Sequence, residues 1–155
     1  MLKSFRELAA QPDAPLKPLA VNARDVVQWL SQSQAKLQDA GQTTISNGTR
    51  MDATWDAVLL ACMAVACAQG WRMTSDRGHH VVVLEGACHA LGLSELRFDE
   101  LDILRDWRNR KYRAGYSVDT DELAEALEWV APFLRDVATW FDENHRAMIK
   151  RGVAP

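Results

Sequence analysis

The chain has 155 residues, 48% of them hydrophobic and 25% charged, and its formal net charge is -3. This length suits a single domain with a buried core, and this hydrophobic content excludes disorder as the main state. Proteins that coat nucleic acid are usually strongly basic, so any contact of this chain with nucleic acid must come from a local patch.

Nothing in the sequence predicts a membrane span, export or a zinc site. The longest wholly apolar run, 57–68, has 12 residues, against the roughly 20 that a bilayer requires. The N-terminus lacks the charged, apolar and small-residue pattern of a secretory signal. Cys62, Cys67 and Cys88 lie among apolar neighbours and form no C-x-x-C pair. We therefore expect a cytoplasmic protein with reduced, buried thiols and no contact with membranes.

The first part of the chain divides into a leader and a helix. Residues 1–21 contain three prolines and no sustained apolar period, which predicts a leader that packs over the surface or is partly mobile. A single helical domain is predicted over 22–150. Its first helix should begin near Asn22, a good cap, run to Ala40 and end at Gly41.

The next two helices are predicted on either side of a loop. The helix over 51–69 is apolar on every side in its middle, so we expect it at the centre of a bundle. Residues expected to be almost fully buried on it are Leu59, Cys62, Val65 and Ala66. A loop is predicted over 71–78, and a third helix should run from His79 or His80 to Leu91.

The last two predicted helices complete an all-α fold. A fourth helix is expected over 99–113. The fifth should begin at Asp119, which forms an Asp-x-x-Glu capping pair with Glu122, and its apolar stripe follows helical spacing. No strand is predicted. The expected fold is therefore a bundle of about five helices behind a proline-containing leader.

The fourth predicted helix carries the strongest candidate site. Five basic side chains and one acid lie within 104–113. Four polar side chains share one face of this helix, because they lie at positions i, i+3, i+4 and i+7. They are Arg105, Arg108, Asn109 and Tyr112. Guanidinium groups bind phosphate oxygens through paired donors, and tyrosine offers a stacking surface. The same cluster also suits a solvated surface whose arginines pair with the acids of the fifth helix.

The stretch RDWRNRKYRAGY in this helix resembles the motif helix of HEPN domains. Many of these domains carry an Arg-Asn or Arg-Asp pair near the end of a late helix, and Arg108-Asn109 stands in that place. The order of segments over roughly 22–145 is also similar. The resemblance implies a HEPN-like bundle that forms a homodimer, binds RNA or a nucleotide, and belongs to a toxin–antitoxin or defence system. An antitoxin-like or nucleotidyltransferase-like protein would be its further partner.

The sequence departs from that family at the residue needed for catalysis. In the ribonuclease members a histidine follows the arginine by a few residues, and here Arg113 stands at that position. A guanidinium stays charged and does not transfer protons at neutral pH. The resemblance therefore implies binding without the usual Arg/His catalysis. The predicted RNA- or nucleotide-binding residues are Arg105, Arg108, Asn109, Tyr112 and Arg113.

Secondary candidates lie where the predicted loop meets the third helix. His79 and His80 open that helix, where free backbone donors can hold an anionic group. Arg72 precedes them at a spacing compatible with an Arg/His pair. One alternative is therefore a metal-independent ribonuclease that uses His79 or His80. The other is a structural or adaptor bundle whose basic helix binds an acidic protein partner.

No cofactor or metal site is predicted. Glu85 and His89 are spaced like a metal pair on a helix, but no third ligand accompanies them. Glycine-rich phosphate loops and nucleophile elbows are absent from the sequence. Two tryptophans of the last helix, Trp129 and Trp140, are candidates for a dimer surface.

Overall fold

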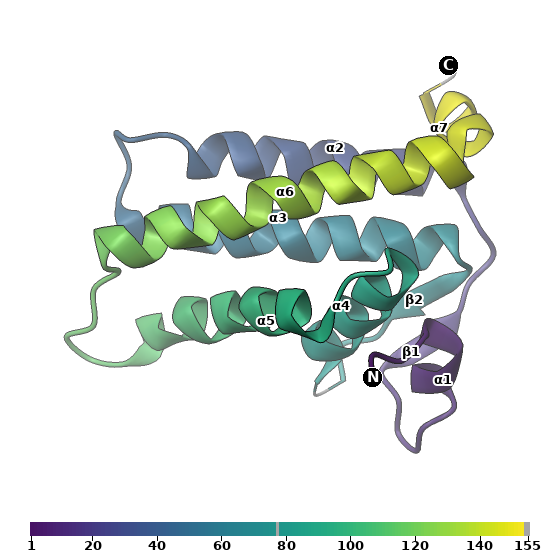
Figure 1. Cartoon of the computed structure of the whole chain (residues 1–155), viewed down its shortest axis with the longest axis horizontal. Coiled ribbons are helices and arrows are strands. Elements are labelled where there is room, and N and C mark those ends of the chain that lie inside the picture. Colours follow the sequence, from purple (N-terminus) through teal and green to yellow (C-terminus); the bar gives the residue numbers. More distant parts are fainter. Residues whose placement is uncertain (77, 154–155) are drawn as a thin grey trace.

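The computed structural model describes residues 1–76 and 78–153. Within them the chain forms seven α-helices, a short 3-10 helix and one two-stranded antiparallel ribbon (Figure 1). The predicted all-α bundle is confirmed. One helix, α3, runs through the middle of the molecule and contacts the helices around it. Those helices are α2 (Ala23–Ala40), α4 (His79–Ala90), α5 (Glu95–Asn109) and α6 (Thr120–Asn144).

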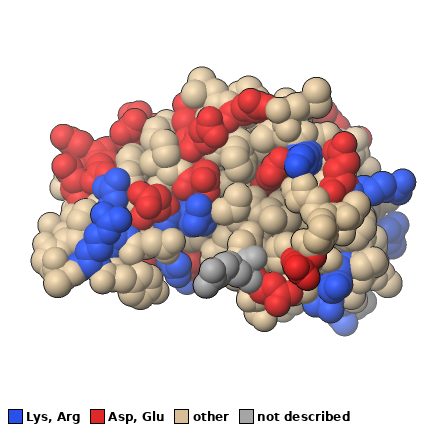
Figure 2. Space-filling model, turned by 90° about the horizontal axis from the view of Figure 1, so that it is seen from below, with Lys and Arg blue, Asp and Glu red and all other residues tan. Residues whose placement is uncertain are grey.

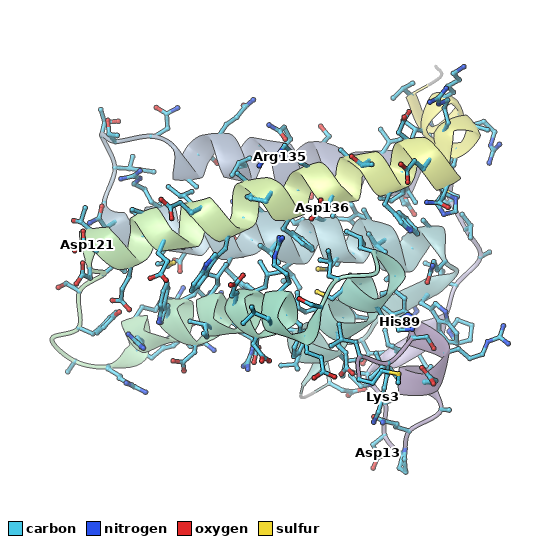
Figure 3. All side chains as sticks on the ribbon, in the orientation of Figure 1. Lys3, Asp13, His89, Asp121, Arg135 and Asp136 are labelled. Carbon is cyan, nitrogen blue, oxygen red and sulfur yellow. The ribbon has the colours of Figure 1, made fainter. Side chains whose placement is uncertain are left out.

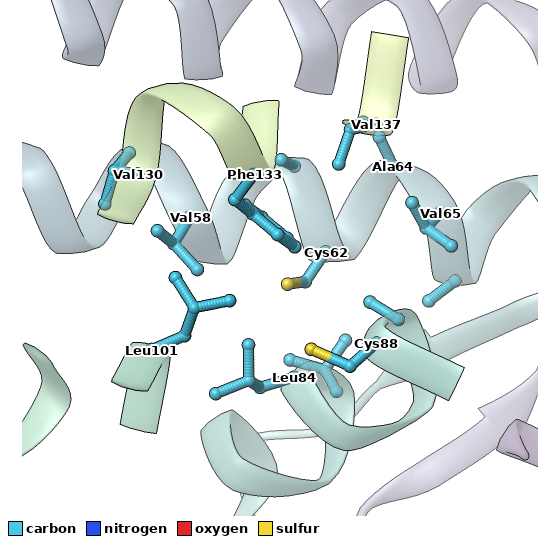
Figure 4. Packing of buried hydrophobic residues seen from close by; sticks show 14 of the residues in the cluster. Val58, Cys62, Ala64, Val65, Leu84, Cys88, Leu101, Val130, Phe133 and Val137 are labelled. Atoms are coloured by element: carbon cyan, nitrogen blue, oxygen red, sulfur yellow. The ribbon is translucent and has the colours of Figure 1, made fainter. Parts of the chain in front are cut away.

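The central position of α3 (Asn47–Ala68) follows from its sequence. It begins four residues earlier than predicted, because the Ser46 side chain accepts a hydrogen bond from Thr49 N–H and caps it. Its apolar middle fills the core, where Figure 4 shows Cys62 beside side chains from α4, α5 and α6. Leu59 is only half-buried, contrary to expectation. The other three residues predicted to be buried on this helix are buried.

The start of α2 matches the prediction, whereas its end differs in backbone conformation. Asn22 caps it as expected, with its side chain accepting a hydrogen bond from Asp25 N–H. Gly41 ends it, but with a φ of -78° rather than the left-handed conformation typical of a glycine at a helix end. The last carbonyl is satisfied from α3 instead, since Arg50 Nε donates to Ala40 O over 2.9 Å.

The start of α6 differs from the predicted capping pair. Asp119 does cap the helix, accepting a hydrogen bond from Asp121 N–H over 2.7 Å. Glu122, however, is not part of a capping box. Its carboxylate accepts hydrogen bonds from Arg110 over 3.0 Å and from Tyr116 over 3.3 Å. The acid therefore ties the loop before α6 to the end of α5.

The two tryptophans proposed for a dimer surface pack within the chain. Trp129 stacks on Trp107 of α5, with ring centroids 5.4 Å apart and planes 23° apart. Trp140 packs against the rings of Phe141 and His145, at centroid distances of 4.9 and 4.7 Å. Both remain half-buried. The Trp129 contact holds α5 against α6, and the Trp140 contacts stabilise the C-terminal end of α6.

The N-terminal segment has regular structure that was not predicted. It forms α1 (Phe5–Ala9), closed by a reciprocal Ser4–Glu7 capping box, and then β1 (Leu16–Pro18). This strand pairs with β2 (Trp71–Met73), which lies in the predicted loop. The predicted loop therefore begins with a strand. Three apolar side chains of the N-terminal segment join the main core: Phe5, Leu8 and Leu16.

A glycine fixes α1 to α4. A Cβ placed on Gly86 would lie 2.3 Å from ring carbons of Phe5, so only glycine admits the ring at this distance. The backbone N–H of Lys3 also donates to Glu85 Oε1 over 2.9 Å. Glu85, considered above as half of a metal pair, is thus engaged by the N-terminal segment.

The chain ends in a helix that the sequence did not predict. α7 (Arg146–Val153) packs against α2. The approach is close at Gly152, where an added Cβ would lie 2.3 Å from Val27 Cγ2 and 2.4 Å from Ala23 O. In Figure 1 this helix closes the end of the bundle at which α6 finishes.

The described residues include one helix, α3, that is long and apolar enough by length and composition to cross a membrane. Its longest uninterrupted apolar run, 57–68, was too short to predict such a helix. Of the most apolar window of α3, 72% is buried inside the bundle. The central helix of a folded core meets the same criteria of length and composition, and α3 occupies that place.

Candidate functional site

The basic face of the helix contains fewer of the predicted residues than helical spacing indicated. Arg105, Arg108 and Asn109 lie on the last turns of α5, which ends at Asn109. Tyr112 belongs to a following 3-10 helix, η1 (Arg110–Tyr112), so helical spacing does not place it on the same face. Its ring is 76% exposed. Arg113 follows η1 in extended conformation and is exposed.

Arg108 is held at the centre of this cluster without being fully paired. Its Nε is buried and has no hydrogen-bond partner among the described residues. The nearest carboxylate oxygen, Asp52 Oδ1, is 3.8 Å away, which is an ion-pair contact but too long for a hydrogen bond. Nη1 donates to Asn109 Oδ1 over 3.2 Å. The guanidinium therefore has one N–H group without an acceptor among the described residues.

The acids opposite Arg108 come from α3 and were missed in the sequence. Asp52 Oδ2 accepts a hydrogen bond from Lys111 over 3.1 Å. Burial raises the pKa of Asp56, while the nearby Lys36 and Arg108 oppose that rise. Asp52 and Asp56 are one helical turn apart on α3, just before its wholly apolar part. These two acids were the feature of the sequence that could have indicated the acidic groups near Arg108.

Two histidines from α4 lie beside the arginines. His79 Nδ1 is 2.7 Å from Asp76 O, so in a neutral ring this nitrogen carries the proton and Nε2 keeps its lone pair. The rings of His79 and His80 are in edge contact, with centroids 4.1 Å apart. His80 in turn lies 6.0 Å from the ring of Trp55 on α3.

The electrostatics of His80 place these groups together. Burial, followed by the charges of His79, Arg108 and Arg105, lowers the pKa of His80 from 6.5 to about 4. The ring is therefore neutral at pH 7. Residues far apart in the sequence, from the start of α4 and the end of α5, thus lie near enough to affect the ionisation of His80. We call this set, Arg105, Arg108, His79 and His80, the basic cluster.

A second unpaired donor lies beside the basic cluster. The indole of Trp55 is fully buried, and its Nε1–H has no hydrogen-bond partner among the described residues. Buried donors without an acceptor are unfavourable by about 1–3 kcal/mol each. With Arg108 Nε, the region holds two buried N–H groups that have no acceptor among the described residues.

Two arginines of this region, one of them in the basic cluster, are already paired with acids. Arg105 Nε donates to Asp102 over 2.9 Å. Arg110 donates to Glu122 over 3.0 Å and to Tyr116 over 3.3 Å. Figure 2 shows Lys and Arg beside Asp and Glu over the face seen from below, rather than one broad positive surface. Charged residues are also spread along α6 and around α1, as the labels in Figure 3 show.

Arg72 is not part of the basic cluster. It lies on β2 and lines a separate apolar hollow of about 240 Å³ together with Trp29, Trp71 and Asp25. The predicted pairing of Arg72 with His79 therefore has no support in the structure. Within residues 1–76 and 78–153, no group of three or more His, Cys, Asp or Glu is placed to hold a metal.

Acid should destabilise the protein through His80. The unfolded histidine takes up its proton near pH 6.5, whereas the folded one does so only near pH 4. The stability contribution is therefore present above pH 6.5 and lost as the pH falls towards 4. Because the ring is partly exposed, we expect a loss of only about 1–2 kcal/mol. Urea unfolding at pH 7 and pH 4.5 should show a smaller loss for His80→Gln than for wild type or for His89→Gln, whose histidine is exposed.

Comparison with known proteins identifies no family for this chain. No protein-family model matches the chain, and no curated protein matches it.

Proposed function

We propose that the protein binds RNA or a nucleotide through a phosphate group at the basic cluster, as a HEPN-like protein without the usual Arg/His catalysis. The observation that supports this most is the buried, unpaired Nε of Arg108 within a positive environment. A phosphate oxygen is a strong acceptor for such a donor, and charge-assisted hydrogen bonds are the stronger kind.

The binding surface in this proposal combines one set of residues from α5 with another from α4. Arg105 and Arg108 supply positive charge, and the neutral His80 supplies a ring rather than a charge. Asn109, Tyr112 and Arg113 lie at the exposed end of the same region and are proposed to contact the rest of the ligand. Tyr112 has the exposure that base stacking requires.

Replacing Arg108 by alanine tests the proposal. Binding of a fluorescein-labelled single-stranded RNA oligonucleotide, and separately of ATP, should weaken by about 1–3 kcal/mol, the range of a hydrogen bond to a charged group. Binding of RNA by wild type should also weaken as salt is added, because phosphate contacts release counterions. Fluorescence anisotropy measures the first ligand and calorimetry the second.

Arg135→Ala is the matched control, since Arg135 is exposed on α6 and the described residues place no carboxylate in ion-pair range of it. It should bind as wild type does. Thermal unfolding by circular dichroism checks that Arg108→Ala is folded. Equal binding by wild type and Arg108→Ala at low salt would reject the proposal and favour the adaptor function, in which the basic residues face an acidic protein.

A second candidate function is a metal-independent ribonuclease centred on His79. The hydrogen bond from His79 Nδ1 to Asp76 O leaves Nε2 as a proton acceptor, which a ribose 2′-hydroxyl requires. Arg105 and Arg108 would then stabilise the charge that develops on the phosphate. Cleavage of the labelled RNA in the presence of EDTA, lost in His79→Ala, would establish this function. Intact RNA after prolonged incubation would reject it.

The proposed partners are a second copy of the chain and an antitoxin-like or nucleotidyltransferase-like protein. α5 exposes two apolar side chains, Leu96 and Ile103, which lie seven residues apart and therefore on the same helical face. That face favours pairing of two copies at α5, which would bring two basic clusters near each other. Sedimentation showing only monomer at micromolar concentration would reject the homodimer.

A further inference from the structure

A trench runs between α2 and α6 on the side of the bundle away from α5. Both helices pack against α3, and side chains from both line the trench. Its narrow part has a volume of about 160 Å³ and its wide part about 510 Å³. Leu30 and Ala138 line both parts, so the two parts adjoin each other. α7 borders the wide part through Ile149 and Lys150.

The lining of this trench is apolar along its length. The other apolar side chains in it are Ala61, Leu134, Val137, Phe141 and Ile149. The buried polar group among its lining residues, the hydroxyl of Ser33, already donates to Ala57 O over 2.6 Å. An occupant therefore finds apolar contact here but few hydrogen-bond partners, which suits a hydrocarbon chain.

Charged side chains lie at one end of the trench. Arg146 forms two hydrogen bonds with Asp142, over 3.1 and 3.0 Å, so the charges of that pair cancel. Lys150 is exposed and has no carboxylate within ion-pair distance among residues 1–76 and 78–153. The trench thus ends beside one uncompensated positive charge.

We propose that this trench binds a single-chain anionic amphiphile such as a fatty acid, with its hydrocarbon chain between α2 and α6 and its carboxylate at Lys150. The apolar lining and the single cation at one end match the two parts of that molecule. A partner helix is about 10–12 Å across and would lie above the narrow part rather than in it. The site shares no residue with the basic cluster and is independent of the function proposed there.

Placing a larger side chain in the trench tests where the hydrocarbon chain of the ligand lies. Wild type should bind dodecanoate, below its micelle concentration, in isothermal titration calorimetry. Ala138→Trp should weaken that binding about tenfold or more, since each methylene displaced from an apolar site removes about 0.8 kcal/mol. Ala138 is exposed, so the larger side chain can be accommodated in the folded protein. Ala124→Trp, at another exposed position of α6, should bind as wild type does.

Reversing the charge at the end of the trench tests the headgroup. Lys150→Glu should weaken dodecanoate binding about tenfold through loss of attraction and new repulsion, yet leave dodecanol binding unchanged. Arg151→Glu, the neighbouring charge reversal on the same helix, should affect dodecanoate much less. Binding to vesicles of anionic lipid without binding of free dodecanoate would contradict the proposal and indicate a membrane surface instead.

Two further results would overturn the proposal. The first is absence of dodecanoate binding by wild type, or equal binding by wild type and Ala138→Trp. The second is a concentration-dependent dimer in sedimentation that Ala138→Trp abolishes, which would assign the trench to a second copy of the chain. Arg108→Ala should bind dodecanoate normally, so failure of the RNA proposal leaves this test unaffected.

Discussion

Replacing Leu101 by alanine is expected to lower the free energy of unfolding by about 2–5 kcal/mol. Leu101 lies on the buried face of α5 and is 0% exposed. Figure 4 shows its side chain directed into the core, towards Val58 of α3 and Leu84 of α4. Truncation removes contacts with several helices at once and leaves a cavity that the rigid centre of the bundle fills only in part. Chemical denaturation monitored by circular dichroism measures the loss.

The same helix provides the control. Leu96 is 67% exposed, so Leu96→Ala should change stability by no more than about 0.5 kcal/mol. Both substitutions remove the same atoms from an α-helix, and any difference between them therefore reports burial. Similar losses in the two variants would contradict the packing of α5 against α3.

Replacing Phe5 by alanine should be comparably destabilising, by about 3–5 kcal/mol. The ring is 1% exposed and packs on Gly86 of α4. This is a large effect for a residue near the start of a chain, where a mobile leader would tolerate the change without loss. Urea unfolding of Phe5→Ala beside Val21→Ala, whose side chain is 47% exposed, measures it.

The contact between Phe5 and Gly86 can also be tested by replacing Gly86. Gly86→Ala would place a methyl group where the Phe5 ring lies, and the overpacking should cost about 1–3 kcal/mol. In the Phe5→Ala background the added methyl has room, so Gly86→Ala should then be nearly neutral. Additive losses in the double variant would show that the two residues do not touch.

Much of the helical framework was predictable because its signals are local. Asn22 marks the start of α2 through the hydrogen bond that its side chain accepts. The central position of α3 follows from a helix that is apolar all round. The same uniformity explains why Leu59 was misjudged. Without a polar face, spacing does not tell which positions face a gap between neighbouring helices.

The β1–β2 ribbon was unpredictable because its support is not local. β1 and β2 have three residues each, too few for an alternating pattern to be recognised. Each depends on the other strand for its hydrogen bonds, and the two are separated by all of α2 and α3. The prolines suggested a loop, yet Pro18 is the last residue of β1, a position that needs no interior ladder bond.

The candidate site was predictable only in part. Arg105 and Arg108 followed from helical spacing, but the end of α5 at Asn109 depends on Arg110 bonding to Tyr116 and Glu122, which no local rule indicates. The proximity of His80 to those arginines is a consequence of how α4 and α5 pack on α3. Sequence spacing cannot show contacts between separate helices.

The ribbon also bears on the order in which the chain folds. Pairing of β1 with β2 closes a loop that contains the whole α2–α3 hairpin. Closing a long loop is entropically unfavourable until its contents are compact, so the helical hairpin should form first and the ribbon with α1 last. Contacts made after the transition state affect unfolding rather than folding rates. In stopped-flow measurements Phe5→Ala should therefore unfold faster while refolding at nearly the wild-type rate, and slowed refolding would place α1 in the folding nucleus.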